Sequence, residues 1–555
     1  MRPVRAALAL VLGLVGVAAG IPTASVAAED APVRLALAMP LVVPQSTTPF
    51  ISGDALAQYT SPTGLLTRQL DAVIGRPVAI GIDPLILASI RVLGSAAPVT
   101  ATAWLDRLAT ATNETFPLAY SDSDLTLATQ AGNLTALVPL SLDFAIDPAL
   151  FAPAPDATAT PTPTPTPTPT LDAGALPALP TSETLVAWPY TLANIAWPRA
   201  DSVVTPDLSA LTATGYTTAI LASGNVTREA GASASVTIDD VPVLVADDGV
   251  TSALSAATHA LGVEEWQSAM DALSASISAA GAAQFGSQPI VFATLDRTAP
   301  LTSSRITDTL GSLQATVGIT SVTMAEALAT PTSAATIVDE PQDPDAVAHL
   351  ARLLLAEQGE QRFAIVASDP GAITGERRLA LLRLTSIAWQ GNSAGWATAT
   401  DDFVAASVDL RDSVQLVKSS GLNFAADRSS IPIYVKNSLD QAVTVYINVH
   451  PETALLAIED PSVKLVIEPN SQGRGEVPAQ ALSNGAVQLT VTLTGPSGEV
   501  IGTPTRTKVN VAAGWETPVV LAFAVFVFGV FGFGIVRSIL KRRRSASADV
   551  SVTDD

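Results

Sequence analysis

Six aspartates follow short apolar segments, at positions where buried strands would end. They are Asp83, Asp122, Asp124, Asp247, Asp248 and Asp296. In a barrel of parallel strands the carboxyl ends share one rim, so acids at these positions would meet there. Paired carboxylates are what glycoside hydrolysis needs, because one protonates the leaving oxygen while the other attacks or stabilises the sugar. The same acids also have a structural interpretation, since a side-chain oxygen at a strand end caps the next helix.

Aromatic and imidazole side chains help to decide between the catalytic and the structural interpretation of these acids. Tyr120, Trp188 and Trp197 are candidates for stacking on sugar rings. The three histidines, His259, His349 and His450, are far apart in the sequence and form no metal-binding spacing. For the same reason, the sequence shows no Ser–His or Cys–His pair in which a histidine would activate a nucleophile. The sequence therefore predicts no metal and no cofactor, and it favours a non-catalytic binding or scaffolding protein, with a carboxylate-dependent glycan-active hydrolase as the alternative.

The elements that must position these acids alternate between strands and helices. Apolar runs at 77–84, 115–120, 216–222, 241–246 and 289–295 predict buried strands, and amphipathic runs such as 101–111 and 263–280 predict helices. Strands that are apolar throughout indicate a largely parallel sheet covered on both faces. We therefore expect an α/β, (β/α) barrel-like domain over residues 29–340.

Two other segments flank or interrupt that domain. Residues 157–170 alternate Thr and Pro, a pattern that blocks helix and sheet and favours an extended polyproline conformation. Because strand-like units occur on both sides, we interpret it as a long surface loop of one domain. Residues 341–419 form three amphipathic stretches, at 343–358, 376–390 and 396–418, and predict a helical segment beside the barrel.

Residues 420–512 have a different pattern. Runs such as 443–450 and 487–494 alternate apolar and polar residues, and turn sequences separate them. Short strands at this spacing predict an antiparallel, immunoglobulin-like β-sandwich. Because it ends just before an apolar run, we interpret it as a stalk.

The two ends of the chain predict export and membrane anchoring. Residues 1–28 have the basic start, apolar centre and small-residue end of a signal peptide. Residues 517–536 are long and apolar enough to cross a bilayer, and Arg537, Lys541 and Arg542 follow. Basic residues beside a span stay on the cytoplasmic side. We expect a single-pass protein of the cell membrane, with its N-terminal ectodomain outside and residues 537–555 in the cytoplasm.

Composition narrows the range of partners. The chain has no cysteine, so no disulfide stabilises it and none can link it to a partner. Its formal net charge is −22, which argues against nucleic acid as a partner.

Several motifs, in their order, resemble a known family. They are IDP at 82–84, FPLAYSDSDL at 116–125, IAWPRAD at 195–201, NFAADRSSIPIYVKNSLDQAVTV at 423–445, SNG at 483–485 and AGWE at 513–516. Together they resemble an actinobacterial family of exported single-pass membrane proteins of unknown function. Its members are often encoded beside a lipid II flippase-like protein, and that resemblance implies a role in cell-envelope assembly with a wall glycan or a wall-precursor transporter as partner. The front domain is also remotely similar to the barrels of polysaccharide deacetylases and glycoside hydrolases.

Overall fold

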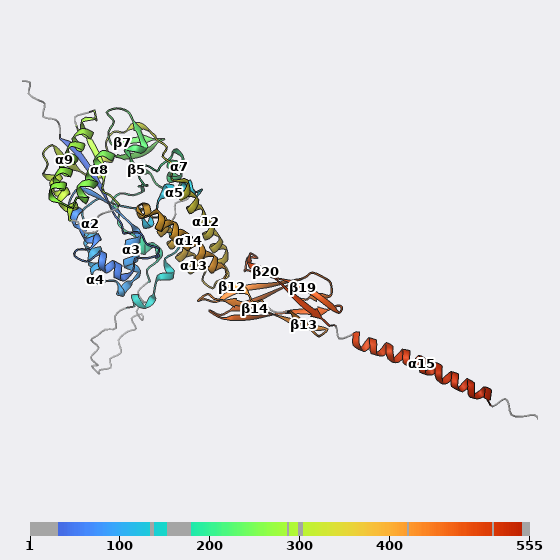
Figure 1. Cartoon of the computed structure of the whole chain (residues 1–555). Helices are drawn as coiled ribbons and strands as arrows, with labels where there is room; N and C mark the ends of the chain where they lie inside the picture. Colours follow the sequence, from blue (N-terminus) through green and yellow to red (C-terminus); the bar gives the residue numbers. More distant parts are fainter. Residues whose placement is uncertain are drawn as a thin grey trace, which may run out of the picture.

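The computed structural model describes residues 32–133, 138–152, 179–285, 288–297, 304–418, 421–512 and 516–546. Figure 1 shows a multidomain, elongated molecule in which an α/β unit is followed by a group of helices, a strand-rich domain and one long helix. The predicted signal peptide (1–28), the Thr-Pro tract (157–170) and residues 547–555 of the predicted tail lie outside the described residues.

The first sheet of the α/β unit is parallel and centred on β1. This strand pairs with β10 along residues 33–36, with β9 along 34–38 and with β2 along 37–41. Nearly every residue of β1 is buried, as expected for a strand covered on both faces. The strands are β1 (Val33–Leu41), β2 (Val78–Ile82), β3 (Thr115–Pro117), β9 (Ile290–Thr294) and β10 (Ile319–Val322).

The second sheet is mixed, which differs from the largely parallel sheet that the sequence predicted. Its order is β4-β5-β8-β7-β11-β6, in which β7 runs antiparallel to β8 and β6 antiparallel to β11. Asp239 and Asp240 form the two-residue turn between β7 and β8, with φ of 47° and 66°. The strands are β4 (Ile195–Ala196), β5 (Thr218–Ala222), β6 (Val226–Arg228), β7 (Ser235–Ile238), β8 (Val241–Ala246) and β11 (Ser333–Ile337).

The two sheets curl toward each other as half-barrels around a shared core. At one junction the backbone N–H groups of Thr191 and Leu192 donate to the carbonyl of Thr115, at 3.0 and 2.9 Å. At the other, the N–H of Asp247 donates to the carbonyl of Phe292 at 2.9 Å. The shared core includes Ala36, Ala79, Phe116, Ile220, Leu244 and Phe292.

Helices cover the outer faces of the half-barrels. Trp104 shows how they are fixed: its ring is buried and its Nε1–H donates to the carbonyl of Leu66 at 3.0 Å. The helices predicted at 101–111 and 263–280 are α4 and α9. The helices of this unit are α1 (Gly53–Tyr59), α2 (Leu65–Val73), α3 (Pro84–Val92), α4 (Val99–Ala109), α5 (Leu125–Gln130), α6 (Ser182–Val186), α7 (Thr205–Ala213), α8 (Asp248–His259), α9 (Val263–Ala282), α10 (Arg305–Ala315) and α11 (Met324–Leu328).

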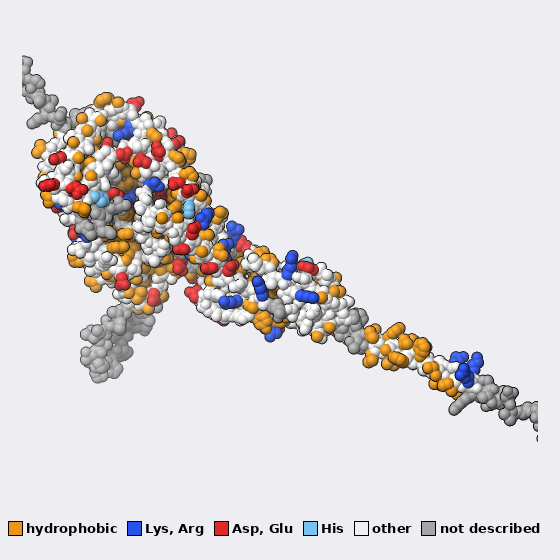
Figure 2. Space-filling model, in the orientation of Figure 1, with side chains coloured by type: hydrophobic (Ala, Val, Ile, Leu, Met, Phe, Trp, Pro, Cys, Tyr) orange, Lys and Arg blue, Asp and Glu red, His pale blue; other side chains and the backbone are white. Residues whose placement is uncertain are grey.

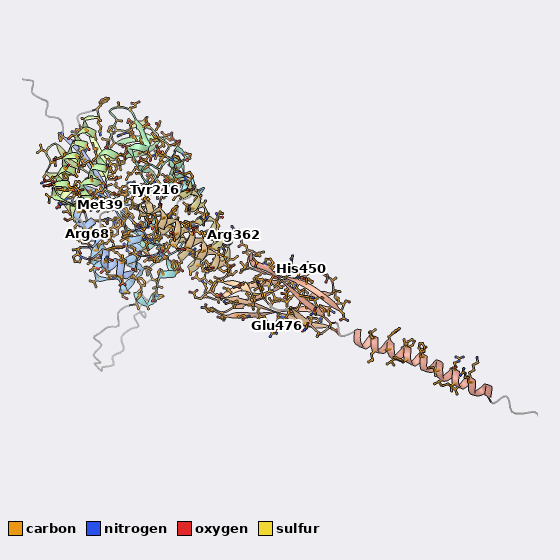
Figure 3. The ribbon with its side chains drawn as sticks, in the orientation of Figure 1. Met39, Arg68, Tyr216, Arg362, His450 and Glu476 are labelled. Carbon is orange, nitrogen blue, oxygen red and sulfur yellow. The ribbon has the colours of Figure 1, made fainter. Side chains whose placement is uncertain are left out.

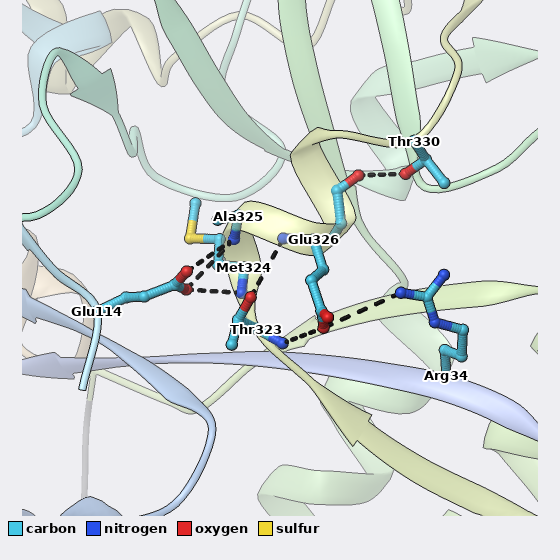
Figure 4. Close-up of polar contacts among 8 residues, drawn as sticks. Arg34, Glu114, Thr323, Met324, Ala325, Glu326 and Thr330 are labelled. Carbon is cyan, nitrogen blue, oxygen red and sulfur yellow. Dashed lines mark hydrogen bonds and ion pairs between the residues drawn. The ribbon is translucent and has the colours of Figure 1, made fainter. Parts of the chain in front are cut away.

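A polar contact joins the amino end of β3 to the start of α11, the short helix that follows β10. The carboxylate of Glu114, just before β3, accepts hydrogen bonds from the N–H groups of Met324 at 2.7 Å and Ala325 at 3.1 Å (Figure 4). Arg34 of β1 lies 4.0 Å from Glu326 of the same short helix. The start of α11 is thereby fixed to β3.

Three helices, α12 (Pro344–Ala364), α13 (Pro370–Leu384) and α14 (Ser393–Arg411), form the helical segment. Leu353 and Leu382 pack into the core of the half-barrels, whereas Phe363 packs into the core of the strand-rich domain. The predicted helices at 376–390 and 396–418 both end earlier than expected. The second gives way to a strand at Val414, because residues 414–416 pair with β14.

The strand-rich domain consists of two sheets whose facing apolar side chains share one core. Their orders are β12-β14-β18-β16 and β13-β20-β19-β15-β17. Alternating burial along β14 and β19 matches the alternation in the sequence. The strands are β12 (Val414–Leu416), β13 (Leu422–Phe424), β14 (Arg428–Asn437), β15 (Val443–Pro451), β16 (Leu456–Ile458), β17 (Ser462–Ile467), β18 (Gln472–Ala481), β19 (Gly485–Thr494) and β20 (Val500–Val511).

The last helix, α15 (Glu516–Ala546), stands apart from the rest of the molecule. Its stretch Val519–Arg542 contains an unburied 18-residue window with a mean hydropathy of 2.8, and it is long and apolar enough to cross a membrane. Figure 2 shows hydrophobic side chains along the helix and basic ones near its far end. It is the one such helix in the described part of the chain, and it fits single-pass membrane anchoring.

Candidate functional site

Three of the six predicted aspartates cap helices at the carboxyl ends of the half-barrel strands. Asp83, Asp124 and Asp247 are the N-cap residues of α3, α5 and α8. In each, Oδ1 accepts a hydrogen bond, 2.9 to 3.1 Å long, from a backbone N–H two or three residues further on. These carboxylates therefore satisfy backbone donors that a helix start leaves unpaired.

Asp83 and Asp122 form a buried acidic pair, with side chains only 1% and 4% exposed. Ser121 and Asp122, in the short 3-10 turn after β3, have left-handed φ values of 61° and 46°. This strained turn brings the N–H of Ser121 to 2.8 Å from Asp83 Oδ1. Burial raises the pKa of Asp83 to about 7, and the charge of Asp122 raises it as well. Burial likewise raises the pKa of Asp122 to about 6.

Arg383, at the end of α13, lies beside Asp83 and comes from the helical segment. It is 2% exposed and donates to Ser121 Oγ at 3.1 Å and to the carbonyl of Pro44 at 3.2 Å. Its charge lowers the pKa of Asp83, although burial has the larger, opposite effect. Arg383 Nε and the hydroxyls of Tyr120 and Tyr190 have no hydrogen-bond partner among the described residues. Burial raises the pKa of Tyr120, and the negative charge of Asp83 raises it further.

A second arginine holds Asp122 from the side of β9. Arg297 Nε lies 3.6 Å from Asp122 Oδ2, and the guanidinium lies 4.8 Å from the ring centroid of Trp197. Arg297 also donates to the carbonyl of Trp197 at 2.6 Å. Trp197, predicted to stack on sugar, thus stacks on Arg297. The other two predicted aromatics are packed in the protein, Tyr120 being buried and Trp188 lying against the main core.

The remaining acids make separate contacts. Asp248 Oδ2 accepts from Ser223 Oγ at 2.7 Å and from the N–H of Gly224 at 2.6 Å. Asp296 Oδ2 accepts from Ser255 Oγ at 3.2 Å, and that hydroxyl lies 3.5 Å from His259 Nδ1. The fold thus brings a serine, a histidine and an aspartate together. Their order differs from that of a Ser–His–Asp triad, because the aspartate contacts the serine and His259 Nδ1 lies 2.8 Å from a carbonyl of its own helix.

An open cavity of about 480 Å³ lies beside the buried acids, between the half-barrels and the helical segment. Its aromatic wall consists of Trp389, which lies in the connection between α13 and α14, and Trp396, which lies in the first turn of α14. Both indole N–H groups donate to backbone carbonyls, Trp389 to Arg383 at 2.9 Å and Trp396 to Leu384 at 2.6 Å. The ring centroids of His349 and Trp396 are 5.4 Å apart. The rings are therefore held in fixed positions.

A hydrogen-bonded chain forms the polar side of the cavity. Arg199 Nη1 donates to Gln342 Oε1 at 2.9 Å, and Gln342 Nε2 donates to Asp124 Oδ2 at 2.8 Å. Of the predicted site residues only Asp124 lines this cavity. The sequence analysis missed the rest because they come from segments far apart in the chain. The closely spaced Trp389 and Trp396 were the available signal.

Within the described ranges, no group of three or more His, Cys, Asp or Glu side chains could hold a metal ion. What the arrangement offers chemically is a buried acidic pair held by two arginines, next to an open cavity with aromatic and polar walls.

Comparison with known proteins shows the family. The sequence profile of DUF6049, a family of unknown function, matches residues 14–548, so the chain belongs to this family. This confirms the expectation of an uncharacterised family; its actinobacterial distribution and genetic neighbourhood stay predictions. A search of curated proteins finds no match.

Similarity to solved structures is weak. The crystal structure of the alpha-amylase AmyC from Thermotoga maritima is 10% identical, with 69% of this chain and 93% of that chain covered and a TM-score of 0.42. Native alpha-2-macroglobulin of E. coli is 19% identical over 18% of this chain, which spans only 7% of that protein's length, at a TM-score of 0.16. A non-cellulosomal cohesin from Archaeoglobus fulgidus is 11% identical, with 19% and 94% covered and a TM-score of 0.14.

Proposed function

We propose that this member of a family of unknown function is a membrane-anchored, extracytoplasmic and non-catalytic protein that acts as a recognition surface in cell-envelope assembly. The half-barrels together form one incomplete (β/α) barrel, and the strand-rich domain is an immunoglobulin-like sandwich that serves as a stalk. The helix α15 anchors them, with residues 537–555 in the cytoplasm. The partner is a cell-wall glycan or a wall-precursor transporter.

One observation carries this proposal: the acids are buried, while the cavity beside them is open. A glycosidase acid must reach the scissile oxygen of a bound sugar. Asp83 is buried beside Arg383 and Asp122 is buried in an ion pair with Arg297, whereas Trp389 and Trp396 line a space of about 480 Å³. That volume is within the range of small-molecule sites, roughly 300 to 1,000 Å³. The accessible chemistry is therefore that of binding.

Blocking the cavity tests the proposal in cells. Ala394 is exposed, lies in the first turn of α14 and lines the cavity, so Ala394→Trp fills it without disturbing a core. Ala405 is exposed on the same helix, about 16 Å further along its axis, and does not line the cavity. In a strain lacking the gene, Ala405→Trp should restore normal wall assembly and Ala394→Trp should not. Equal complementation by the two folded variants would refute recognition through this cavity.

The alternative, a carboxylate-dependent glycan-active hydrolase, is favoured by the raised pKa values of two adjacent acids. A carboxyl that stays protonated near neutral pH can act as a general acid. In this arrangement Arg383 would first have to move away. Cleavage of wall glycan by the purified chain, lost in a folded Asp122→Asn variant, would make the hydrolase the better assignment. Full complementation by the same variant would support the non-catalytic role.

A further inference from the structure

The aromatic wall of the cavity offers carbon and π surface rather than hydrogen bonds. Both indole N–H groups already donate to backbone carbonyls, so Trp389 and Trp396 have no free donor for a partner. Their orientation is fixed before anything binds, which lowers the entropic cost of stacking. Rigid aromatic rings of this kind fit the C–H faces of a sugar ring.

The charged side chains around the cavity are mostly acidic. Asp124, Asp343 and Asp345 line it, and Arg199 is its one guanidinium among the described residues. Arg199 is already engaged with Gln342. A concave site with an excess of negative over positive side chains concentrates a negative field, so it repels anionic ligands. Carboxylate oxygens are also strong acceptors for hydroxyl and ammonium donors.

Amide and hydroxyl groups complete the lining. Gln390, Ser386 and Ser393 supply both donors and acceptors, as a ligand with many hydroxyl groups requires. From these walls we infer that the cavity binds a mono- or disaccharide unit that is uncharged or carries an amine, and that it discriminates against uronic acids and other anionic sugars. This inference rests on the proposed recognition function and names the ligand class of the same cavity.

The experiment compares sugars that share ring stereochemistry and differ in charge through one substituted group. The probes are glucose, galactose and mannose, each as the neutral sugar, the 2-amino sugar and the uronic acid. Binding to the full chain in detergent is measured by saturation-transfer NMR and tryptophan fluorescence. In at least one series the neutral and amino forms should bind at least tenfold more tightly than the uronate, and Ala394→Trp should abolish this binding while Ala405→Trp preserves it.

A charge variant with a matched control tests the cause of the discrimination. Asp345 and Asp54 are both exposed acids in the first turn of a helix, in α12 and α1, and only Asp345 lines the cavity. Asp345→Asn should strengthen uronate binding several-fold, whereas Asp54→Asn should leave it unchanged. Uronate binding as tight as that of the neutral sugar would overturn the inference. A lack of binding by every sugar would also overturn it. If Ala394→Trp nevertheless fails to complement the strain lacking the gene, recognition through the cavity stands and its ligand belongs to another chemical class.

Discussion

Replacing Asp83 by Asn should stabilise the protein at neutral pH and leave its stability unchanged in acid. Asn keeps a side-chain oxygen that can accept from the N–H groups of Leu85 and Ser121, the two bonds that Asp83 Oδ1 accepts. Asn is also a good N-cap residue. What the change removes is the ability to ionise at a position that is 1% exposed.

The size of the effect follows from the raised pKa of Asp83. The pKa is about 7 in the folded protein, against an ordinary value of 3.8 for an aspartate. Between these values the folded state binds a proton that the unfolded state releases, so the free energy of unfolding falls as the pH rises. The full pKa difference corresponds to a loss of roughly 4 kcal/mol from the free energy of unfolding. This loss is complete above about pH 7 and absent below about pH 4. Protonated Asp83 and Asn are both uncharged, so Arg383 has an uncharged neighbour in either case. The free energy of unfolding of Asp83→Asn should therefore not fall as the pH rises from about 4 to about 7.

The assay is urea unfolding of the full chain in detergent, followed by tryptophan fluorescence at pH 4, 5, 6, 7 and 8. The gain of Asp83→Asn over the wild type should rise from near zero at pH 4 by at most about 1.4 kcal/mol per pH unit and level off near pH 7. Asp54→Asn, an exposed first-turn acid, should follow the wild-type profile. Parallel profiles for wild type and Asp83→Asn would show that folding does not raise the pKa of Asp83, and the argument from burial would fail.

Three further predictions test the fold and the topology. Gly81→Ala should destabilise the half-barrels by roughly 1 to 3 kcal/mol in the same urea assay, because an added Cβ would lie 2.8 Å from Leu118 Cδ2; an unchanged midpoint would show that this core can relax. Protease added to intact protoplasts should digest the part before α15 and spare a C-terminal tag, and a protected ectodomain would contradict the proposed orientation. Deleting residues 160–170 should shift the melting temperature by only a few degrees, because loop-closure entropy changes slowly with length; loss of expression would mean that the Thr-Pro tract packs against the rest of the protein.

Local patterns in the sequence predicted much of the α/β unit. The apolar run at 77–84 contains β2, and Asp83 stands at its end as expected, because a buried strand followed by a helix start leaves a clear signature. The reversal at Asp239 and Asp240 was missed. Both residues are left-handed, but neither is the glycine that usually marks such a turn, so the antiparallel strand β7 was not predicted.

The cavity could not be predicted, because its walls depend on tertiary contacts. Gln342 precedes α12, yet it contacts Asp124, which caps α5 in the half-barrels. Nothing in the spacing of the two residues indicates this contact. Arg383 likewise had no signal, since a lone arginine on an amphipathic helix usually faces solvent and here it is buried.

The end of α13 both covers the acids and forms the cavity, which links the two candidate functions. The N–H of Asp124 donates to the carbonyl of Thr385 at 2.8 Å, and Ser123 pairs with Ser386 as an isolated β-bridge. These contacts place Arg383 over Asp83, while Thr385 and Ser386 form part of the cavity wall. Moving α13 far enough to expose the acids would therefore dismantle the wall. On this geometry, the proposed recognition in the cavity and catalysis at the acids would exclude each other, and the observed position of α13 is the one that keeps the cavity wall intact.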